Sequence, residues 1–338
     1  MEIKNKVWLV AAVTMSVVTS CGHDLLKPLD AQVRLSADNT YEAGSKVTFD
    51  FDGYADYVYF YSGESGSEYS KRDRTEVSLD EVEYADMTVT LSVNNGKTGG
   101  LEVYVTDLFE GLSGTDMERD GLLVNGLEEA ISQDDMTIPG WMRLDLKEPA
   151  NKNEPASVTV HDISEYLSNF LVAVRWKPVA ESVADMQRYY YFQFIVDVKF
   201  KGRDVTRYSG NTSVFGYTLY NVNTIEGHED DHYFNGERYD GKVRTQVYFN
   251  TGAYPDGFRM DGGRNLGELI HAWIISKPQN LAVVAPDKGL TIKSYSDDMA
   301  SYSHVYDEPG TYTATFVMSN GNIQGTEKVV KEVTFEIR

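Results

Sequence analysis

The chain has 338 residues, a formal net charge of −21 at pH 7, 23 tyrosines and a single cysteine. The negative charge argues against nucleic acid and anionic lipid surfaces as partners, and it disfavours polyanionic glycans as ligands. Because one cysteine cannot form a disulfide within the chain, packing alone must stabilise the fold.

The N-terminus has the pattern of a lipoprotein signal peptide. Lys4 and Lys6 precede the apolar run Val7–Val18, which is too short to span a bilayer. Small residues directly precede Cys21, as cleavage by a lipoprotein signal peptidase requires. We predict that residues 1–20 are removed, that acylated Cys21 anchors the protein to a membrane, and that residues 21–29 form a tether. An ordinary cleaved signal with a chance cysteine is the alternative.

Short segments of alternating apolar and polar residues predict β-strands along the whole body of the chain. The clearest are Ser45–Asp52, Tyr54–Tyr61, Thr88–Val93, Leu101–Val105, Phe170–Trp176 and Tyr189–Phe200. Asn94–Lys97 is typical of a hairpin turn between its two neighbouring strands. Helix is favoured at Gly121–Ile131 and Arg264–Ile270. Strands this short and closely spaced predict an all-β protein built from β-sandwiches.

The C-terminal residues predict one more sandwich sheet. Pro309 and Gly310 favour a tight turn, after which alternation places four apolar side chains on one face, those of Tyr312, Ala314, Phe316 and Met318. This segment resembles the second half of a PKD-type immunoglobulin-like domain. Residues 43–49 and 57–66 resemble the first half of such a domain.

We therefore expect a discontinuous organisation. Residues 30–80 and 288–338 would form the PKD-like sandwich, with residues 85–285 inserted between them. The insert resembles a galactose-binding-like jelly roll in the segments Leu101–Thr106, His161–Leu167, Val172–Trp176 and His271–Pro278. Two separate small domains are the alternative, but each end alone is marginal for a hydrophobic core.

Several features together resemble a family of Bacteroidota surface lipoproteins that carry a domain of unknown function. They are Cys21 with its preceding small residues, the Phe60–Tyr69 loop, the Ala272–Pro278 strand and Pro309–Thr313. Such proteins are similar to the SusE/SusF-like glycan-binding partners of SusC/SusD uptake systems. The resemblance implies passive capture of polysaccharide or oligosaccharide at the outer-membrane surface, beside a SusC/SusD-like transporter complex. Residues 22–25 offer only Asp24 as an acidic export signal, so the periplasmic leaflet stays open.

Sugar binding requires aromatic rings for pyranose faces and polar side chains for hydroxyl groups. The richest supply lies between residues 206 and 265. Our candidate ligand-binding residues are Trp141, Tyr233, Phe234, Asn235, Arg238, Tyr239 and Tyr254. Trp141 follows Pro139–Gly140 at a loop-to-strand junction and is the best single candidate for a sugar platform. Trp176 and Trp273 continue apolar strands, so we expect them to be buried. For each candidate aromatic residue, packing in the hydrophobic core is the alternative role.

The chain offers weaker signals for metal binding and catalysis. His228–His232 has the residue types of a metal site, but its spacing matches no metal motif and an exposed acidic loop explains it better. We expect no cofactor; a structural calcium ion on carboxylates such as Asp134–Asp135 or Asp230–Asp231 stays open. Ser62–Glu64 has the composition of a turn.

The sequence contains none of the local motifs that mark a serine-hydrolase elbow, a zinc protease or a phosphate loop. We therefore expect a binding protein and not an enzyme. A structural or adhesive surface lipoprotein of the fimbrial type is the first alternative, and a glycoside hydrolase is the second.

Overall fold

The computed structural model describes residues 28–338 except 38–39, 134–137, 180–181, 183–184, 240–241, 244, 263–267 and 324. The predicted signal peptide, Cys21 and most of the tether lie outside the described residues, as do Asp134 and Asp135. The described chain is all-β, as predicted, and antiparallel pairing dominates its sheets.

In chain order the elements are β1 (Asp30–Leu35), β2 (Thr40–Tyr41), β3 (Lys46–Tyr54), β4 (Tyr57–Tyr61), η1 (Tyr69–Lys71), η2 (Leu79–Glu81), β5 (Val82–Val93), β6 (Leu101–Thr106), α1 (Met117–Gln133), β7 (Met142–Arg143), β8 (Ser157–Asp162), η3 (Ser164–Tyr166), β9 (Leu171–Trp176), β10 (Tyr190–Phe200), β11 (Thr206–Ser209), α2 (Thr212–Phe215), β12 (Tyr217–Asn221), β13 (Arg238–Tyr239), β14 (Lys242–Val243), β15 (Val247–Thr251), β16 (Tyr254–Met260), β17 (Ala272–Ser276), β18 (Leu290–Lys293), β19 (Ser301–Val305), β20 (Gly310–Asn322) and β21 (Gly325–Ile337). The η elements are single 3₁₀ turns.

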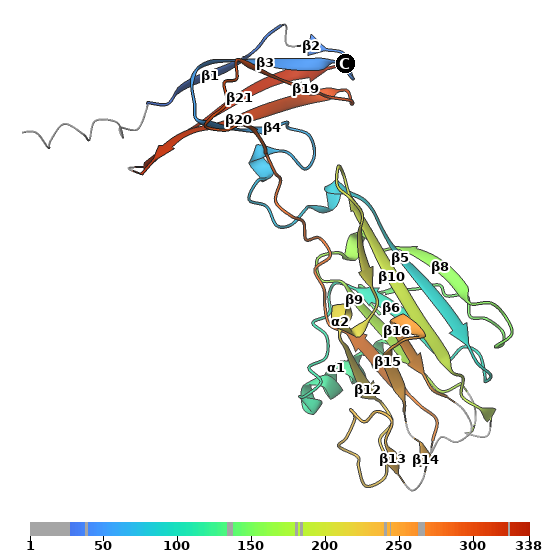
Figure 1. Ribbon diagram of the computed structural model, residues 1–338. Coiled ribbons are helices and arrows are strands. Elements are labelled where there is room, and N and C mark those ends of the chain that lie inside the picture. The colour runs from blue at the N-terminus through green and yellow to red at the C-terminus, as the bar shows by residue number, and fades with distance from the viewer. Residues whose placement is uncertain are drawn as a thin grey trace, which may run out of the picture. The chain divides into compact units, whose positions relative to one another are not determined.

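The chain folds into two compact units. Unit 1 combines the residues up to Thr75 with Ala285–Arg338, and unit 2 consists of Glu76–Val284. The boundaries expected from the sequence, 30–80 with 288–338 and 85–285, lie close to these. Figure 1 shows the blue N-terminal strands of unit 1 beside the red C-terminal strands.

Unit 1 is a sandwich of two sheets. One has the order β1-β3-β19, and the other has the order β18-β4-β20-β21-β2. The ring of Phe49 on β3 meets the rings of Phe60, Phe316 and Phe335 on the facing sheet, with centroids 5.9, 5.0 and 5.8 Å away. Phe49 is fully buried, so it lies at the centre of a core to which both ends of the chain contribute.

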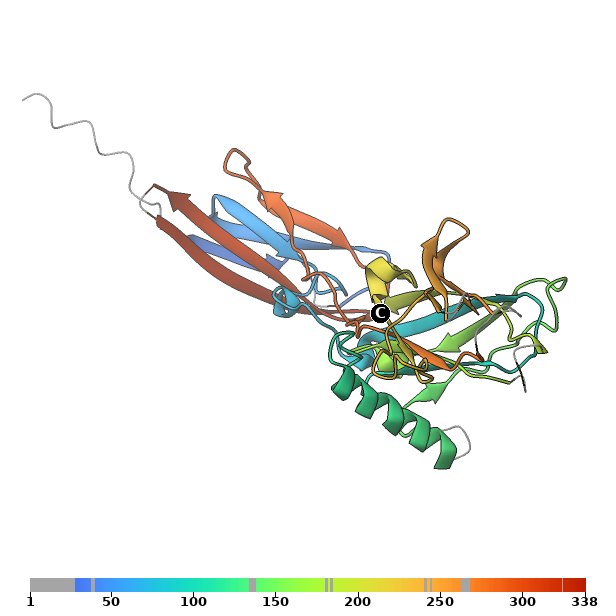
Figure 2. The same cartoon turned by 90° about the horizontal axis from the view of Figure 1, so that it is seen from below.

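Unit 2 is a second sandwich. The sheet with the order β15-β16-β10-β5-β8, to which β11 adds on β10, is named the β10 sheet; the β9 sheet has the order β12-β17-β9-β6-β7. Phe192, Phe258 and Trp176 are buried between them. Helix α1 covers the outer face of the β9 sheet, where Val124 and Leu127 join a second apolar cluster (Figure 2).

The expected burial of two tryptophans is confirmed. Trp176 and Trp273 both have no exposed surface, but they lie on opposite faces of the β9 sheet. Trp176 points into the space between the sheets, and Trp273 lies beneath α1. No helix among the described residues has the length and apolar content needed to cross a membrane.

The hairpin expected at Asn94–Lys97 is wrong. Strand β5 pairs with β8 and β10, whereas β6 pairs with β7 and β9, so the two strands belong to different sheets. The Arg188 guanidinium holds the connection by donating to the Gly96 carbonyl at 3.1 and 2.9 Å. Gly96 has a φ of 133°, and a Cβ atom there would lie 2.6 Å from Arg188 Cα, so this close approach requires glycine.

The helix expected at Gly121–Ile131 is confirmed and lies within α1. The one expected at Arg264–Ile270 is wrong for residues 268–270, the part that the structure describes. The side-chain amide of Gln187 bonds both backbone groups of Ile270, at 2.6 and 2.7 Å. This tertiary contact takes the place of helical hydrogen bonds.

Replacing Phe49 by alanine is expected to destabilise unit 1 by about 3–5 kcal/mol, because the side chain leaves a cavity among three rings. Amide hydrogen exchange in β3, β20 and β21 should accelerate. The unfolding of unit 2, followed by the fluorescence of Trp141, Trp176 and Trp273, should stay unchanged. Tyr59→Ala, at a side chain that is 44% exposed, is the matched control. Equal destabilisation of both units would contradict a separate core for unit 1.

Candidate functional site

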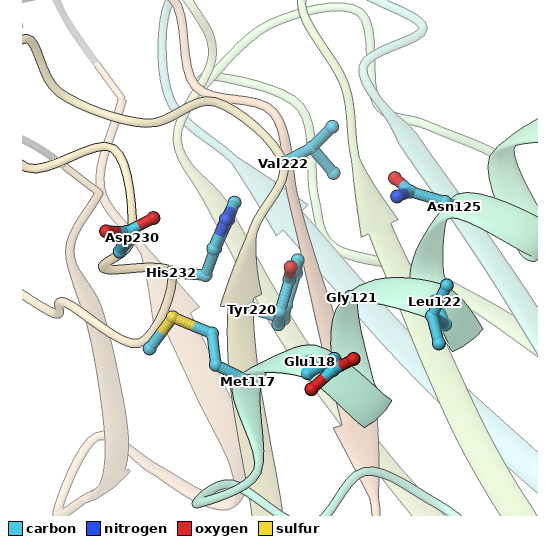
Figure 3. A pocket seen from close by; sticks show the side chains of 9 residues that line it. All are labelled: Met117, Glu118, Gly121, Leu122, Asn125, Tyr220, Val222, Asp230 and His232. Carbon is cyan, nitrogen blue, oxygen red and sulfur yellow. The ribbon is translucent and has the colours of Figure 1, made fainter.

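A pocket of about 420 Å³ lies in unit 2 between α1 and the strand β12 with its following loop. Figure 3 shows side chains of α1 on one wall and side chains of β12 and the loop on the other. Its lining combines Tyr220, Val222, Leu122, Met117 and Gly121 with the polar side chains of Glu118, Asn125, Asp230 and His232. The pocket is therefore amphipathic, with more than one carboxylate and an amide on apolar walls.

The pocket wall on α1 follows from helical periodicity. Residues three or four positions apart share one side of a helix. This spacing joins Glu118, Gly121, Leu122 and Asn125 into one stripe that lines the pocket. The neighbouring stripe of Val124, Leu127 and Ile131 is buried against the β9 sheet. Helix α1 thus binds the sheet with one stripe and presents a second stripe to the pocket.

The start of α1 is fixed by two aspartates. Asp116 caps the helix by accepting a hydrogen bond from the Arg119 backbone N–H at 3.0 Å. The fully buried Asp120 accepts from the backbone N–H groups of Ser113 and Gly114, both at 2.9 Å, and from the Tyr233 hydroxyl at 2.7 Å. Burial alone would raise the pKa of Asp120, but these hydrogen bonds outweigh it and lower the pKa.

On the opposite wall, the ring of His232 stacks on the ring of Tyr220, with centroids 4.6 Å apart and planes inclined by 7°. His232 Nδ1 lies 2.6 Å from the Asn221 carbonyl oxygen and must donate there, because a carbonyl only accepts. The Asn221 amide in turn donates to the carbonyls of His232 and Phe234, both at 2.9 Å. The loop is thereby pinned to the end of β12, and its histidine is held in one orientation.

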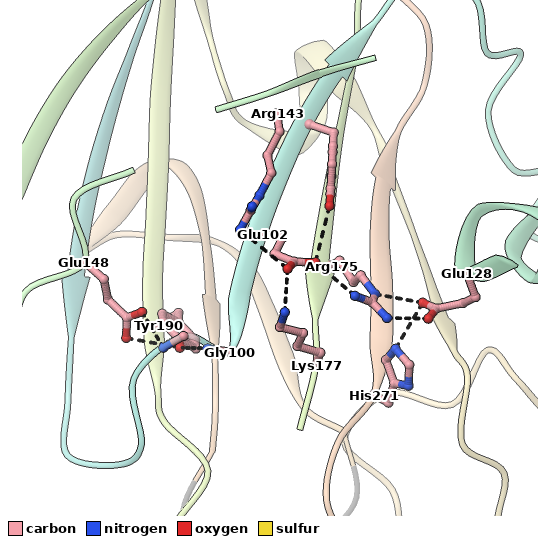
Figure 4. Close-up of polar contacts among 11 residues, drawn as sticks. Gly100, Glu102, Glu128, Arg143, Glu148, Arg175, Lys177, Tyr190 and His271 are labelled. Carbon is pink, nitrogen blue, oxygen red and sulfur yellow. Dashed lines mark hydrogen bonds and ion pairs between the residues drawn. The ribbon is translucent and has the colours of Figure 1, made fainter. Parts of the chain in front are cut away.

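A partly buried ionic network between α1 and the β9 sheet holds the helix to the sheet (Figure 4). Glu128 accepts hydrogen bonds from Trp273 Nε1 at 2.7 Å, from His271 Nε2 at 3.0 Å and from the Arg175 guanidinium. Burial alone would raise the pKa of Glu128, but the hydrogen bonds from His271 and Arg175 outweigh it and lower the pKa to about 2. Glu128 is therefore a carboxylate at neutral pH.

The network continues across the sheet to Glu102, which is 2% exposed. Arg175 Nη1 donates to Glu102 at 3.0 Å, and Lys177 completes the pairing from the end of β9. Burial raises the pKa of Glu102, but the bonds from Lys177 and Arg175 outweigh it and lower the pKa. Because each buried charge meets opposite charge, the network is compatible with its low exposure.

The structure distributes the predicted ligand-binding residues over several places. Trp141 is half-buried and packs against the rings of Tyr104 and Phe109, with centroids 6.3 and 5.3 Å away. Tyr233 lies beside the pocket and its hydroxyl donates a hydrogen bond to Asp120, whereas the side chain of Phe234 is buried, with 5% of its surface exposed.

The remaining candidates lie elsewhere in unit 2. Asn235 bonds both backbone groups of Val247, at 2.8 and 3.0 Å, which ties its loop to β15. Tyr254 belongs to the β10 sheet, where its ring stacks on Tyr191. Arg238 and Tyr239 form β13, but their side chains lie outside the described residues. The predicted set therefore does not form one common platform.

Sequence reasoning missed the pocket residues on α1. Glu118 and Asn125 carry no motif of their own, and the helix predicted at Gly121–Ile131 included Asn125 but began after Glu118, so it did not reveal their shared face. His232 stood out in the sequence as part of an acidic cluster with histidines, although its role in the structure is to stack on Tyr220.

The weaker sequence signals have structural roles. Among the described residues no three His, Cys, Asp or Glu side chains are grouped so that they can hold a metal ion. In the Ser62–Glu64 turn, Gly63 has a φ of 84° and Glu64 Oε2 pairs with His304 Nε2 at 2.8 Å.

Residues 20–121 match a protein family described as a domain of unknown function (DUF5017). The match runs to the first turns of α1, so it covers the first segment of unit 1 and the beginning of unit 2. No curated protein and no solved structure matches the chain. The match agrees with the expected domain of unknown function and assigns neither a ligand nor an activity.

Replacing Glu128 by glutamine is expected to destabilise unit 2 by about 3 kcal/mol at pH 7, because Arg175 loses its carboxylate partner. The folded-state pKa of Glu128, about 2, lies below its ordinary value of 4.5, so its contribution is present above pH 4.5 and is lost as the pH falls toward 2. Denaturant unfolding should show the difference between wild type and variant shrinking over this range. The neighbouring exposed Glu129→Gln is the control, and a pH-independent difference would contradict the assignment.

Proposed function

We propose that the protein is a non-catalytic envelope lipoprotein whose pocket captures a sugar ring of an oligosaccharide or polysaccharide. The observation that carries this proposal is the composition of the 420 Å³ cavity, in which apolar walls and convergent polar side chains face the same space. Its volume falls within the range of about 300–1,000 Å³ that is usual for small-molecule sites.

The polar groups of the pocket suit hydroxyl ligands. Glu118 and Asp230 accept hydrogen bonds from hydroxyl groups, whereas the Asn125 amide both donates and accepts. Val222 and the small exposed part of Tyr220, whose side chain is 4% exposed and stacked on His232, provide an apolar wall for the C–H groups of a pyranose ring. Two carboxylates at the opening repel anionic sugars, so the supported ligand is a neutral or amino sugar.

The binding site is largely preformed, which supports capture without chemistry. The loop that carries His232 is fixed by Asn221, and α1 is fixed by Glu128 and Asp120. A site that is ordered before its ligand arrives loses little conformational entropy on binding. A lipid anchor at Cys21 would then concentrate captured sugar near a SusC/SusD-like transporter in the outer membrane, on the SusE/SusF-like pattern.

An adhesive function is the second candidate, and one feature favours it. Strand β8 is at the edge of the β10 sheet, and its Val158 and Val160 are 62% and 60% exposed. An uncovered edge strand with apolar side chains is suited to strand addition. Self-association of the protein without any sugar binding would favour this function.

Replacing Gly121 by leucine is expected to reduce sugar affinity at least about tenfold, because a Cβ atom there lies 3.0 Å from the Tyr220 hydroxyl and a longer side chain enters the pocket. Full-length protein in detergent would be screened on a glycan array, and affinity for the best free sugar would be measured by calorimetry.

Gly126→Leu on the same helix is the matched control, because a Cβ atom at Gly126 meets nothing within 4 Å. Both substitutions raise helix propensity equally, so any difference between them reports on the pocket. Equal binding by both variants would place the sugar elsewhere. Release of reducing ends by the wild type would show hydrolysis instead of capture.

Replacing Cys21 by serine is expected to abolish lipid anchoring, since the thiol is the acylation site that we propose. In cells fed labelled palmitate, the wild type should carry the label and sediment with membranes, and the variant should do neither. Asp24→Ala should keep the label. Labelling of the serine variant would exclude Cys21 as the modified residue.

A further inference from the structure

The outer face of the β10 sheet differs from the outer face of the β9 sheet. Along β10, buried and half-buried residues alternate strictly, and Phe192 and Phe194 face the core between the sheets. No apolar cluster among the described residues covers the opposite face. Its paired side chains include Gln193 with Thr90, followed by Ile195 with Thr88. At the β8 edge, Val158 and Val160 pair with Thr90 and Thr88, so this uncovered face combines small and polar side chains with a few exposed apolar ones.

An aromatic row crosses one end of this face. Register pairs Tyr248 on β15 with Arg259 on β16, Arg259 with Tyr191 on β10, and Tyr191 with Ser92 on β5. Directly paired residues project on the same side of a sheet. We name these four residues the tyrosine row. With strands about 4.8 Å apart, the row extends about 14 Å, which exceeds one sugar ring.

The polar and aromatic groups of the row are held by one another. The Arg259 guanidinium lies 4.2 Å from the Tyr248 ring centroid and donates to Asp261 Oδ2 at 2.9 Å. Tyr254 stacks on Tyr191 with centroids 4.8 Å apart and planes inclined by 27°. Each of these side chains is half-buried, so it combines a fixed position with partial access to solvent.

We propose that the tyrosine row, with Tyr254 and the adjoining Gln193, is a second carbohydrate site that binds an extended neutral glycan chain. The inference rests on the proposed function in taking carbohydrate as the ligand class. It adds a separate surface, on the side of the unit 2 sandwich away from α1, and a different ligand form. The pocket receives one ring, whereas the row lies along several.

The charge of the row selects the ligand. Arg259 is neutralised by Asp261, so the row has no surplus cation for a carboxylated or sulfated chain. The whole protein carries −21, which further repels polyanions. Phenol, amide and hydroxyl groups on a flat face with aromatic rings match a neutral chain that has hydroxyl edges and apolar ring faces.

The test is affinity electrophoresis of full-length protein in detergent, through gels containing amylopectin, galactomannan, xyloglucan, arabinoxylan or the anionic polygalacturonate. At least one neutral polysaccharide should retard the wild type more strongly than polygalacturonate does. Tyr254→Ala and, separately, Gln193→Ala should weaken that retardation about tenfold, while Tyr59→Ala in unit 1 should leave it unchanged. Thermal unfolding would verify that each variant is folded.

The two sites are distinguished by crossing probes and variants. Tyr254→Ala should keep its calorimetric affinity for the free sugar, and Gly121→Leu should keep part of the retardation by the polymer. If both variants keep their affinity for the free sugar and Tyr254→Ala loses binding to the polymer, the pocket would be refuted and the row supported. Unchanged retardation of Tyr254→Ala and Gln193→Ala, or strongest retardation by polygalacturonate, or none by any polymer, would overturn the row.

Discussion

Glu128 lies on the side of α1 that faces the β9 sheet, where its charge requires hydrogen-bond donors. The rest of the candidate site depends on where the sheet provides these donors. Strand register aligns Tyr220, Trp273, Arg175 and Glu102 in one row across the β9 sheet. Arg175 on β9, Trp273 on β17 and His271 just before β17 donate to Glu128, so α1 has one favourable position above the sheet. That position sets the distance between the polar stripe of α1 and the wall formed by β12, which is the width of the pocket.

The two sheets of unit 2 use the same alternation to different ends. On the β9 sheet the outward side chains are large and apolar or ionic, including Leu171, Tyr104 and Trp273, and α1 buries them. On the β10 sheet the outward side chains are mostly small, polar or tyrosine, with Val158 and Val160 at the β8 edge, and the described chain leaves them uncovered. Where α1 covers the β9 sheet, a concave pocket forms at the edge of the helix, whereas the uncovered face of the β10 sheet is an open surface. On the two proposals above, one sandwich would accommodate two forms of ligand without a change of fold.

Unit 1 shows how a chain can leave a sandwich and return to it. The buried Asp287, just after the return at Ala285, accepts from the Glu68 backbone N–H at 2.9 Å and from Arg74 Nε at 3.0 Å. Glu68 and Arg74 lie just before the exit at Thr75. These contacts hold the exit and return segments together within unit 1. Its core needs both segments, because Phe49 packs against Phe316 and Phe335.

Local pattern alone was enough to indicate the all-β class, the alternation around Val47 and Phe49, the helix in α1, and the burial of Trp176 and Trp273. Each depends on side-chain periodicity within one element, which the sequence displays directly. Only the tertiary structure decided that β5 and β6 join different sheets and that Trp273 faces α1. It also separated Phe234, which is buried, from Trp141 and Tyr254, which are half-buried. Tyrosine and phenylalanine serve cores and binding surfaces alike, so composition predicts that rings are present, while long-range pairing decides which of them meet solvent.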